Sequence, residues 1–181
     1  MMQKAGIYLL VSMVLIMPVF STAMQSFEQG QQLLESGRPI EAAVAFREAL
    51  EQNPRYLDAW LGLAEAFLQL QELDQALEAA EEARRLGGRS VTVLNLYADV
   101  LLSLGRIDDA FAIYQQVLSI EPDNTDAVLG QAQIALAHNH TDKALQDFRL
   151  ALERSPRNRT ALLSLAIVAE TNGDYESAQN Y

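Results

Sequence analysis

The sequence predicts an all-α protein built from stacked helical hairpins, and three observations support this prediction. Apolar residues recur at the spacing of one helix face, as in Leu94, Tyr97, Ala98, Leu101 and Leu102. Glycine, asparagine or proline interrupts these apolar runs at regular intervals, where helices end. The whole pattern returns every 34 residues. The unit of the fold is therefore a pair of short helices, copied along the chain.

The unit is clearest between residues 91 and 124. Its first helix is expected to end at Gly105, because a residue without a Cβ readily adopts the left-handed conformation that closes helices. Asp108 and Asp109 follow in the first turn of the second helix, where the helix dipole favours acidic side chains. Pro122 ends that second helix. These residues predict an αα-hairpin with one apolar seam.

Marker residues recur along the chain at the same interval. The end of the second helix is marked by Pro54, Gly88, Pro122 and Pro156. The turn inside each hairpin carries Gly37, Gln71, Gly105, Asn139 and Gly173. The middle of the first helix carries Gly30, Ala64, Ala98, Ala132 and Ala166, and the start of the second carries Ala42, Ala76, Ala110, Ala144 and Ala178. Side chains this small allow two helices to approach closely.

These motifs resemble the tetratricopeptide repeat, a 34-residue helix-turn-helix unit with large apolar, small and proline positions in a fixed order. The second copy supplies Trp60, Leu63, Ala64, Phe67 and Ala76, and the third supplies Leu94, Tyr97, Ala98, Leu101, Ala110, Tyr114 and Pro122. The resemblance implies a right-handed α-solenoid of stacked repeats. It also implies that Trp60, at the tryptophan position of the family, belongs to the core.

The period divides the chain into five expected repeats. They are a degenerate capping repeat with a polar first helix at 24–56, three full repeats at 57–90, 91–124 and 125–158, and an incomplete repeat at 159–181. Because a helix in the last few residues would be too short to be stable, we expect the sequence to be the N-terminal part of a longer array. Ser90, Asn124 and Asn158 precede first helices and are expected to cap them.

Residues 1–23 form a separate segment with the parts of a secretory signal peptide. Lys4 supplies a positive charge, residues 5–20 are nearly all apolar, and Ser21-Thr22-Ala23 places small residues before a cleavage site. The alternative is an uncleaved membrane anchor, although this apolar run spans only about 24 Å as a helix, less than the roughly 30 Å hydrocarbon core. Both alternatives place the repeats outside the cytoplasm, which is the periplasm if the cell is a Gram-negative bacterium. Membrane contact is then limited to this segment.

Composition excludes several classes of function. A formal charge of -11 without a basic stripe argues against nucleic acid as a partner. The absence of cysteine excludes disulfides, thiolate metal sites and a cysteine nucleophile. No H-E-x-x-H, G-x-S-x-G or phosphate-loop motif is present. His138 and His140 lack an evident third metal ligand, so we expect no metal, no cofactor and no enzyme activity.

The resemblance also implies a partner-binding surface. In tetratricopeptide repeat proteins the first helices line a concave groove, which repeat positions 2, 5, 9 and 12 usually face. In this chain these positions hold Asp58, Leu61, Glu65, Leu68, Thr92, Asn95, Asp99, Leu102, Asp126, Leu129, Gln133 and Leu136, and Thr160, Leu163 and Ile167 extend the row. Leucines among carboxylates suit a protein or peptide segment with apolar anchors and basic character. The alternative is that these leucines only pack between adjacent repeats.

The sequence therefore predicts a non-enzymatic scaffold of the cell envelope that holds a segment of another protein in its groove. Resemblance to exported bacterial arrays of the family suggests a part in assembling a secretion, pilus or polysaccharide-export machine. A glycan or cell-wall binding module is the alternative. Glycan sites favour exposed rings, whereas the following aromatic residues occupy expected core positions: Trp60, Phe67, Tyr97, Tyr114 and Phe148.

Overall fold

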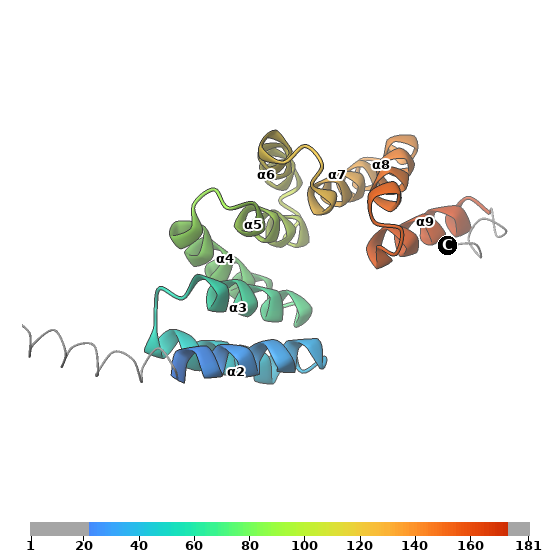
Figure 1. The fold of residues 1–181 in the computed structure, drawn as a ribbon. Helices are drawn as coiled ribbons and strands as arrows, with labels where there is room; N and C mark the ends of the chain where they lie inside the picture. The colour runs from blue at the N-terminus through green and yellow to red at the C-terminus, as the bar shows by residue number, and fades with distance from the viewer. Residues whose placement is uncertain (1–21, 174–181) are drawn as a thin grey trace, which may run out of the picture. The chain divides into compact units, whose positions relative to one another are not determined.

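The computed structural model describes residues 22–173, and this part of the chain is an all-α helical solenoid, as the sequence predicts (Figure 1). The chain divides into two compact units, Met1–Arg89 and Ser90–Tyr181. Most of the expected signal segment, residues 1–21, lies outside the described residues. The same holds for residues 174–181 of the expected incomplete repeat.

The first unit contains two helical hairpins. Residues 22–35 form its first helix, which α2 (Pro39–Gln52) follows after a short turn. The second hairpin consists of α3 (Leu57–Gln69) and α4 (Leu73–Gly87). Helix α3 packs against both α2 and α4, so it is the central element of this unit.

The second unit contains two further hairpins and one additional helix. The hairpins are α5 (Val91–Ser103) with α6 (Ile107–Ile120), and α7 (Thr125–Ala137) with α8 (Thr141–Arg154), and α9 (Arg159–Thr171) follows. Each helix packs on the next, and α5 also contacts α7. The first helices of neighbouring hairpins therefore lie side by side and form a wall. None of the helices found in residues 22–173 has both the length and the apolar character that crossing a bilayer requires.

The turns inside the hairpins lie where the sequence predicts them. Their central residues, Gly37, Gln71, Gly105, Asn139 and Gly173, all have positive φ values between 59° and 76°. In the first turn the N–H of Gly37 donates to the carbonyl of Leu34 at 3.0 Å, and that of Arg38 donates to Leu33 at 2.9 Å. This pair of bonds closes the helix in a Schellman motif. The pattern of glycine and asparagine therefore reflects backbone conformation.

Two of the three expected caps form. The Oδ1 atoms of Asn124 and Asn158 accept hydrogen bonds from the N–H groups of Ala127 at 3.0 Å and Ala161 at 2.9 Å. Ser90 immediately precedes α5, but its side chain makes no capping hydrogen bond. The prediction of a side-chain cap is therefore wrong at Ser90.

A large aromatic ring on the second helix fills the space between the first helices. Phe46 of α2 is fully buried, and a Cβ added at Gly30 or Gly62 would lie 2.6 or 2.5 Å from its ring. Tyr114 of α6 is also fully buried, and a Cβ at Gly130 of α7 would lie 2.2 Å from its ring. Such distances are shorter than real carbon contacts. These glycines are required because the rings occupy the space of their missing side chains.

Helix α4 is the exception to this packing. Its buried residues are all alanines, namely Ala76, Ala79, Ala80 and Ala83. Ala80 stands at the repeat position that Phe46, Tyr114 and Phe148 occupy in the other second helices. Trp60 of α3, predicted to lie in the core, is only partly buried. Trp60 and Ala79 of α4 line one hollow.

Replacing Gly130 with alanine tests the ring packing. Because the new Cβ would overlap the Tyr114 ring, we expect the free energy of unfolding to fall by about 1–3 kcal/mol. In an unobstructed helix the same change would instead raise it by up to about 1 kcal/mol. Urea denaturation measures the difference. Ser164→Ala, at the equivalent position of α9, is the control and should change stability by less than about 0.5 kcal/mol.

Candidate binding surface

The first helices of the hairpins carry one hollow in each unit. In the first unit, the Leu61 hollow has a volume of about 510 Å³, and its lining includes Phe27, Gln31, Glu35, Asp58, Leu61 and Glu65. In the second unit, the Leu102 hollow has a volume of about 330 Å³, and its lining includes Asp99, Leu102, Asp126, Leu129, Gln133 and Thr160. Most of the residues expected to face a groove therefore line one of these two hollows.

The remaining expected residues lie in different surroundings. Thr92 is exposed on α5, while Leu68 and Leu136 are half-buried and line neither hollow. Leu136 packs against the core cluster around Phe148. Leu163 and Ile167 of α9, which extend the row, are exposed.

Two expected groove residues are buried and have structural roles. Asn95 is 8% exposed, and its Nδ2 donates to Oδ1 of Asn124 at 3.0 Å, which ties α5 to the cap of α7. Leu129 is 6% exposed and belongs to the core cluster that contains Phe148 and Leu165. For Leu129, packing between repeats is therefore the main role, and only its edge lines the hollow.

Residues of helix 22–35 line the Leu61 hollow but are absent from the groove residues that the sequence predicts. Phe27 and Gln31 stand 34 residues before Leu61 and Glu65, at the same two repeat positions. They were not expected because the first repeat, with its polar helix, was interpreted only as a cap. Applying the same repeat positions to this first copy would have identified both.

A carboxylate pair over a buried tyrosine dominates the electrostatics of the Leu102 hollow. The hydroxyl of Tyr114 donates to Oδ1 of Asp99 in a short hydrogen bond. Desolvation by the surrounding protein and the nearby charge of Asp126 raise the pKa of Asp99 to about 6, although the bond from Tyr114 acts in the opposite direction. Burial raises the pKa of Tyr114 well above its usual value, so its hydroxyl keeps its proton.

The lining of the Leu61 hollow is also acidic. Desolvation by the protein around it raises the pKa of Glu65, and Asp58 and Glu35 line the same space. No lysine or arginine among residues 22–173 lines either hollow. Both hollows therefore offer carboxylates and leucines to a ligand, without a compensating positive charge.

The two histidines lie at the turn between α7 and α8. His138 and His140 lie on either side of Asn139, with ring centroids 6.2 Å apart. Within residues 22–173, no three histidine, aspartate or glutamate side chains gather closely enough to hold a metal ion. The pair remains a polar feature of the turn between α7 and α8.

Repeated helical hairpins, with a hollow on the first helices of each unit, define a helical repeat protein. The chain belongs to the tetratricopeptide repeat family. The family model "Cytochrome c-type biogenesis protein H TPR domain" matches residues 28–153, which is more than half of the chain, and the model "Tetratricopeptide repeat" matches residues 129–179. Members of this family are generally protein-interaction scaffolds without catalytic activity.

Solved structures support the same fold. The structure of PilF from Pseudomonas aeruginosa is similar with a TM-score of 0.71 and 22% identity, over 91% of this chain and 75% of that one. PilW, described as a widely conserved type IV pilus biogenesis factor, is similar with a TM-score of 0.74 and 21% identity, over 88% of this chain and 74% of that one.

Curated relatives are much longer proteins. The peroxisomal targeting signal receptor of Pichia angusta is 33% identical over 98 residues, which is 54% of this chain and 17% of the receptor. The chain spans 27% of another relative, the BBSome complex member BBS4 of Bos taurus. The similarity therefore concerns the repeat architecture shared by these proteins.

Substituting Asp99 with asparagine tests the carboxylate site. The folded protein binds the Asp99 proton more tightly than the unfolded chain, whose pKa is near 3.8. The free energy of unfolding should therefore fall as the pH rises from about 4 to about 6, by an amount limited because Asp99 remains partly in contact with water.

Asp99→Asn keeps an acceptor for Tyr114 and removes this dependence. We expect the variant to gain stability relative to the wild type as the pH rises, and to be the more stable protein at pH 7. Urea denaturation at a series of pH values measures the difference between the two proteins. A difference that stays constant between pH 4 and pH 7 would contradict the raised pKa.

Proposed function

We propose that this chain is a non-enzymatic scaffold that holds a segment of another protein against the first helices of its hairpins. The observation that supports this proposal is the shared chemistry of the Leu61 hollow and the Leu102 hollow. Each combines leucine with carboxylates and has no basic side chain in its lining. The complementary ligand is a peptide segment with apolar anchors and basic side chains.

The apolar part of such a contact supplies affinity, and the charges supply selectivity. Burying one leucine-sized anchor is worth about 1.5–3 kcal/mol before the cost of association. Leu61 and Leu102 are half-buried in the free protein, so each retains surface that a partner can cover. In these two hollows the lining offers a glycan only one partly exposed ring, that of Phe27, because Phe46 is fully buried.

The proposed location is the cell envelope. Residues 1–23 have the parts of a signal peptide or an apolar anchor, which would export the repeats to the periplasm. The fold is shared with PilF and PilW, and PilW is described as a type IV pilus biogenesis factor. We therefore propose a part in assembling an envelope machine, such as a pilus, a secretion system or a polysaccharide exporter.

Polar substitutions in the two hollows test the partner site. We expect Leu61→Asn/Leu102→Asn to lose the protein that the wild type captures from envelope extract, because both apolar anchors are removed while the fold is kept. Circular dichroism and urea denaturation check the fold, and mass spectrometry quantifies the captured protein. Leu102 serves this purpose better than Leu129, whose near-complete burial would make a polar replacement disrupt the core.

Ile40→Asn/Val44→Asn is the matched control. Both side chains are large and exposed on α2, and neither lines the Leu61 hollow. The control should retain the partner that Leu61→Asn/Leu102→Asn loses. Retention by the hollow variant, or equal loss by the control, would place the interface elsewhere on the protein.

A reporter fusion tests export. Residues 1–23 fused to mature β-lactamase should give ampicillin resistance in a Gram-negative host, because the enzyme protects only from the periplasm. Deleting residues 5–20 removes the apolar run and should abolish resistance. Sensitivity of cells carrying the intact fusion, with the fusion protein present in the cytoplasm, would contradict the proposed location.

A further inference from the structure

A third hollow in the first unit lies between helices α2, α3 and α4. Its volume is about 400 Å³, and it shares no lining residue with the Leu61 hollow. Helix α3 supplies Trp60, Leu63 and Phe67, while α2 and α4 supply Glu51 and Glu78. We call this space the Trp60 hollow. It is a second surface of the unit, separate from the proposed partner groove.

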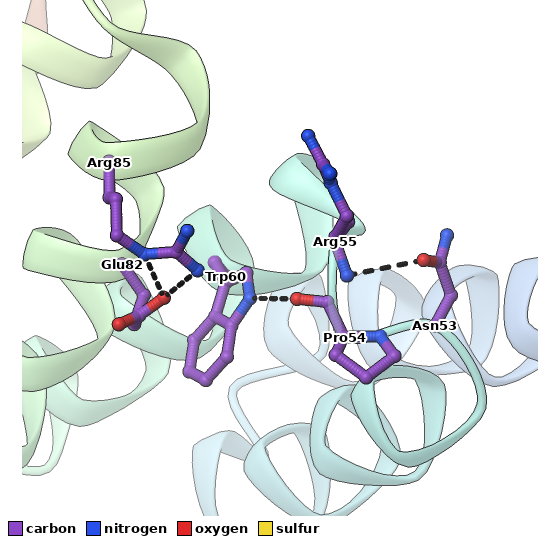
Figure 2. A network of polar contacts seen from close by, with 6 residues as sticks. All are labelled: Asn53, Pro54, Arg55, Trp60, Glu82 and Arg85. Carbon is purple, nitrogen blue, oxygen red and sulfur yellow. Dashed lines mark hydrogen bonds and ion pairs between the residues drawn. The ribbon is translucent and has the colours of Figure 1, made fainter.

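The apolar lining of the Trp60 hollow is well ordered. Leu63 and Phe67 are each 4% exposed, so their side chains are held by the core. The indole Nε1 of Trp60 donates to the carbonyl of Pro54 at 3.0 Å (Figure 2). This bond fixes the plane of the ring, and the rest of the ring remains partly accessible. A ligand would therefore meet a preorganised aromatic surface.

Arg47 of α2 is already engaged within the same hollow. Its guanidinium lies 5.1 Å from the centroid of the Phe67 ring, and its Nη2 donates to Oε1 of Gln75 at 3.0 Å. These contacts link α2 to α4. The Phe67 ring is consequently occupied by a cation of the protein itself, whereas no cation from residues 22–173 lies over the Trp60 ring.

The two carboxylates of the Trp60 hollow have no ion-pair partner among residues 22–173. Glu51 and Glu78 are exposed, and neither forms an ion pair or side-chain hydrogen bond within the part of the chain that the structure describes. Glu82 differs, since it accepts from Arg85 at 2.6 Å (Figure 2). Two carboxylates against the single charge of Arg47 leave the lining net negative.

The rings and carboxylates that line the Trp60 hollow are not a general feature of the repeat. Two repeats further along the chain, the positions of Glu51, Trp60, Phe67 and Glu78 hold Ser119, Val128, Ala135 and Gln146. The second unit therefore lacks both the large rings and the carboxylates at these positions. The combination is particular to the first unit.

We propose that the Trp60 hollow binds an arginine side chain of a partner protein, with its aliphatic stem on Trp60 and Leu63 and its guanidinium between Glu51 and Glu78. Arginine fits because a planar guanidinium stacks on an indole face and forms paired hydrogen bonds with carboxylates. The net charge of -11 favours the approach of a basic segment. This contact is independent of the groove on the first helices.

Two peptides that differ in one charge test the proposal. The probes are Ac-Ala-Ala-Arg-Ala-Ala-NH2 and its citrulline analogue, which keeps the shape of the side chain and removes the positive charge. Trp60 is the single tryptophan of the chain, so its fluorescence and its indole N–H resonance report binding at this site directly. We expect a saturable change with the arginine peptide, and binding roughly three- to tenfold weaker with the citrulline peptide or with Glu51→Gln/Glu78→Gln.

Glu48→Gln/Glu81→Gln is the matched control. Both residues are exposed on the same two helices, neither lines the Trp60 hollow, and the change in net charge is identical. The control should bind the arginine peptide within about twofold of the wild type. Equal weakening in the control, equal binding of the citrulline peptide, or no saturable change at Trp60 would each overturn the proposal. Leu61→Asn/Leu102→Asn should leave the Trp60 response intact, so failure of the groove and failure of this site remain distinguishable.

Discussion

The contact between one aromatic ring and the bare backbone of flanking helices is the constraint on which this structure depends. Phe46 reaches the first helix at Gly30 and α3 at Gly62, and Tyr114 reaches α7 at Gly130. A helix can bring such a ring this close only where the opposing residue has no Cβ. The spacing between hairpins within each unit is therefore set by a few glycine and alanine positions, and the hollows on the first helices lie around the same rings.

The same packing connects the core to the Leu102 hollow. Tyr114 is fully buried, yet its hydroxyl ends at the Asp99 carboxylate, which lines the Leu102 hollow. A core side chain thus supplies a hydrogen-bond donor beneath a surface acid. In the first unit the residue that stands to Glu65 as Tyr114 stands to Asp99 is Ala80, which has no hydroxyl, so Glu65 lacks such a donor. The two hollows consequently differ in how their carboxylates are held.

Sequence reasoning predicted the fold and the hairpin turns because both depend on local backbone geometry. Gly37 and Asn139 are residue types that favour left-handed turns, and the repeat position of Gln71 places it in the same turn. The accessibility of individual groove positions depends instead on residues distant in the sequence. Asn95 is buried because Asn124 accepts its hydrogen bond, and the repeat position alone contains no sign of that partner.

The exposure of Trp60 likewise could not be predicted from its repeat position. That position predicts a core residue, but Trp60 is only partly buried and lines a hollow between α2, α3 and α4. What the sequence could not supply is that Glu51 of α2 and Glu78 of α4 line the same hollow.

The alanine-only buried face of α4 also has a consequence for how evenly stability is distributed along the chain. Free energy gained on burial scales with the apolar area removed from water, and a methyl group removes far less area than Tyr114 or Phe148 does in α6 or α8. Local opening of a protein begins where such contacts are fewest. Helix α4 should thus detach more readily than its counterparts, and its backbone amides should exchange their protons with solvent sooner.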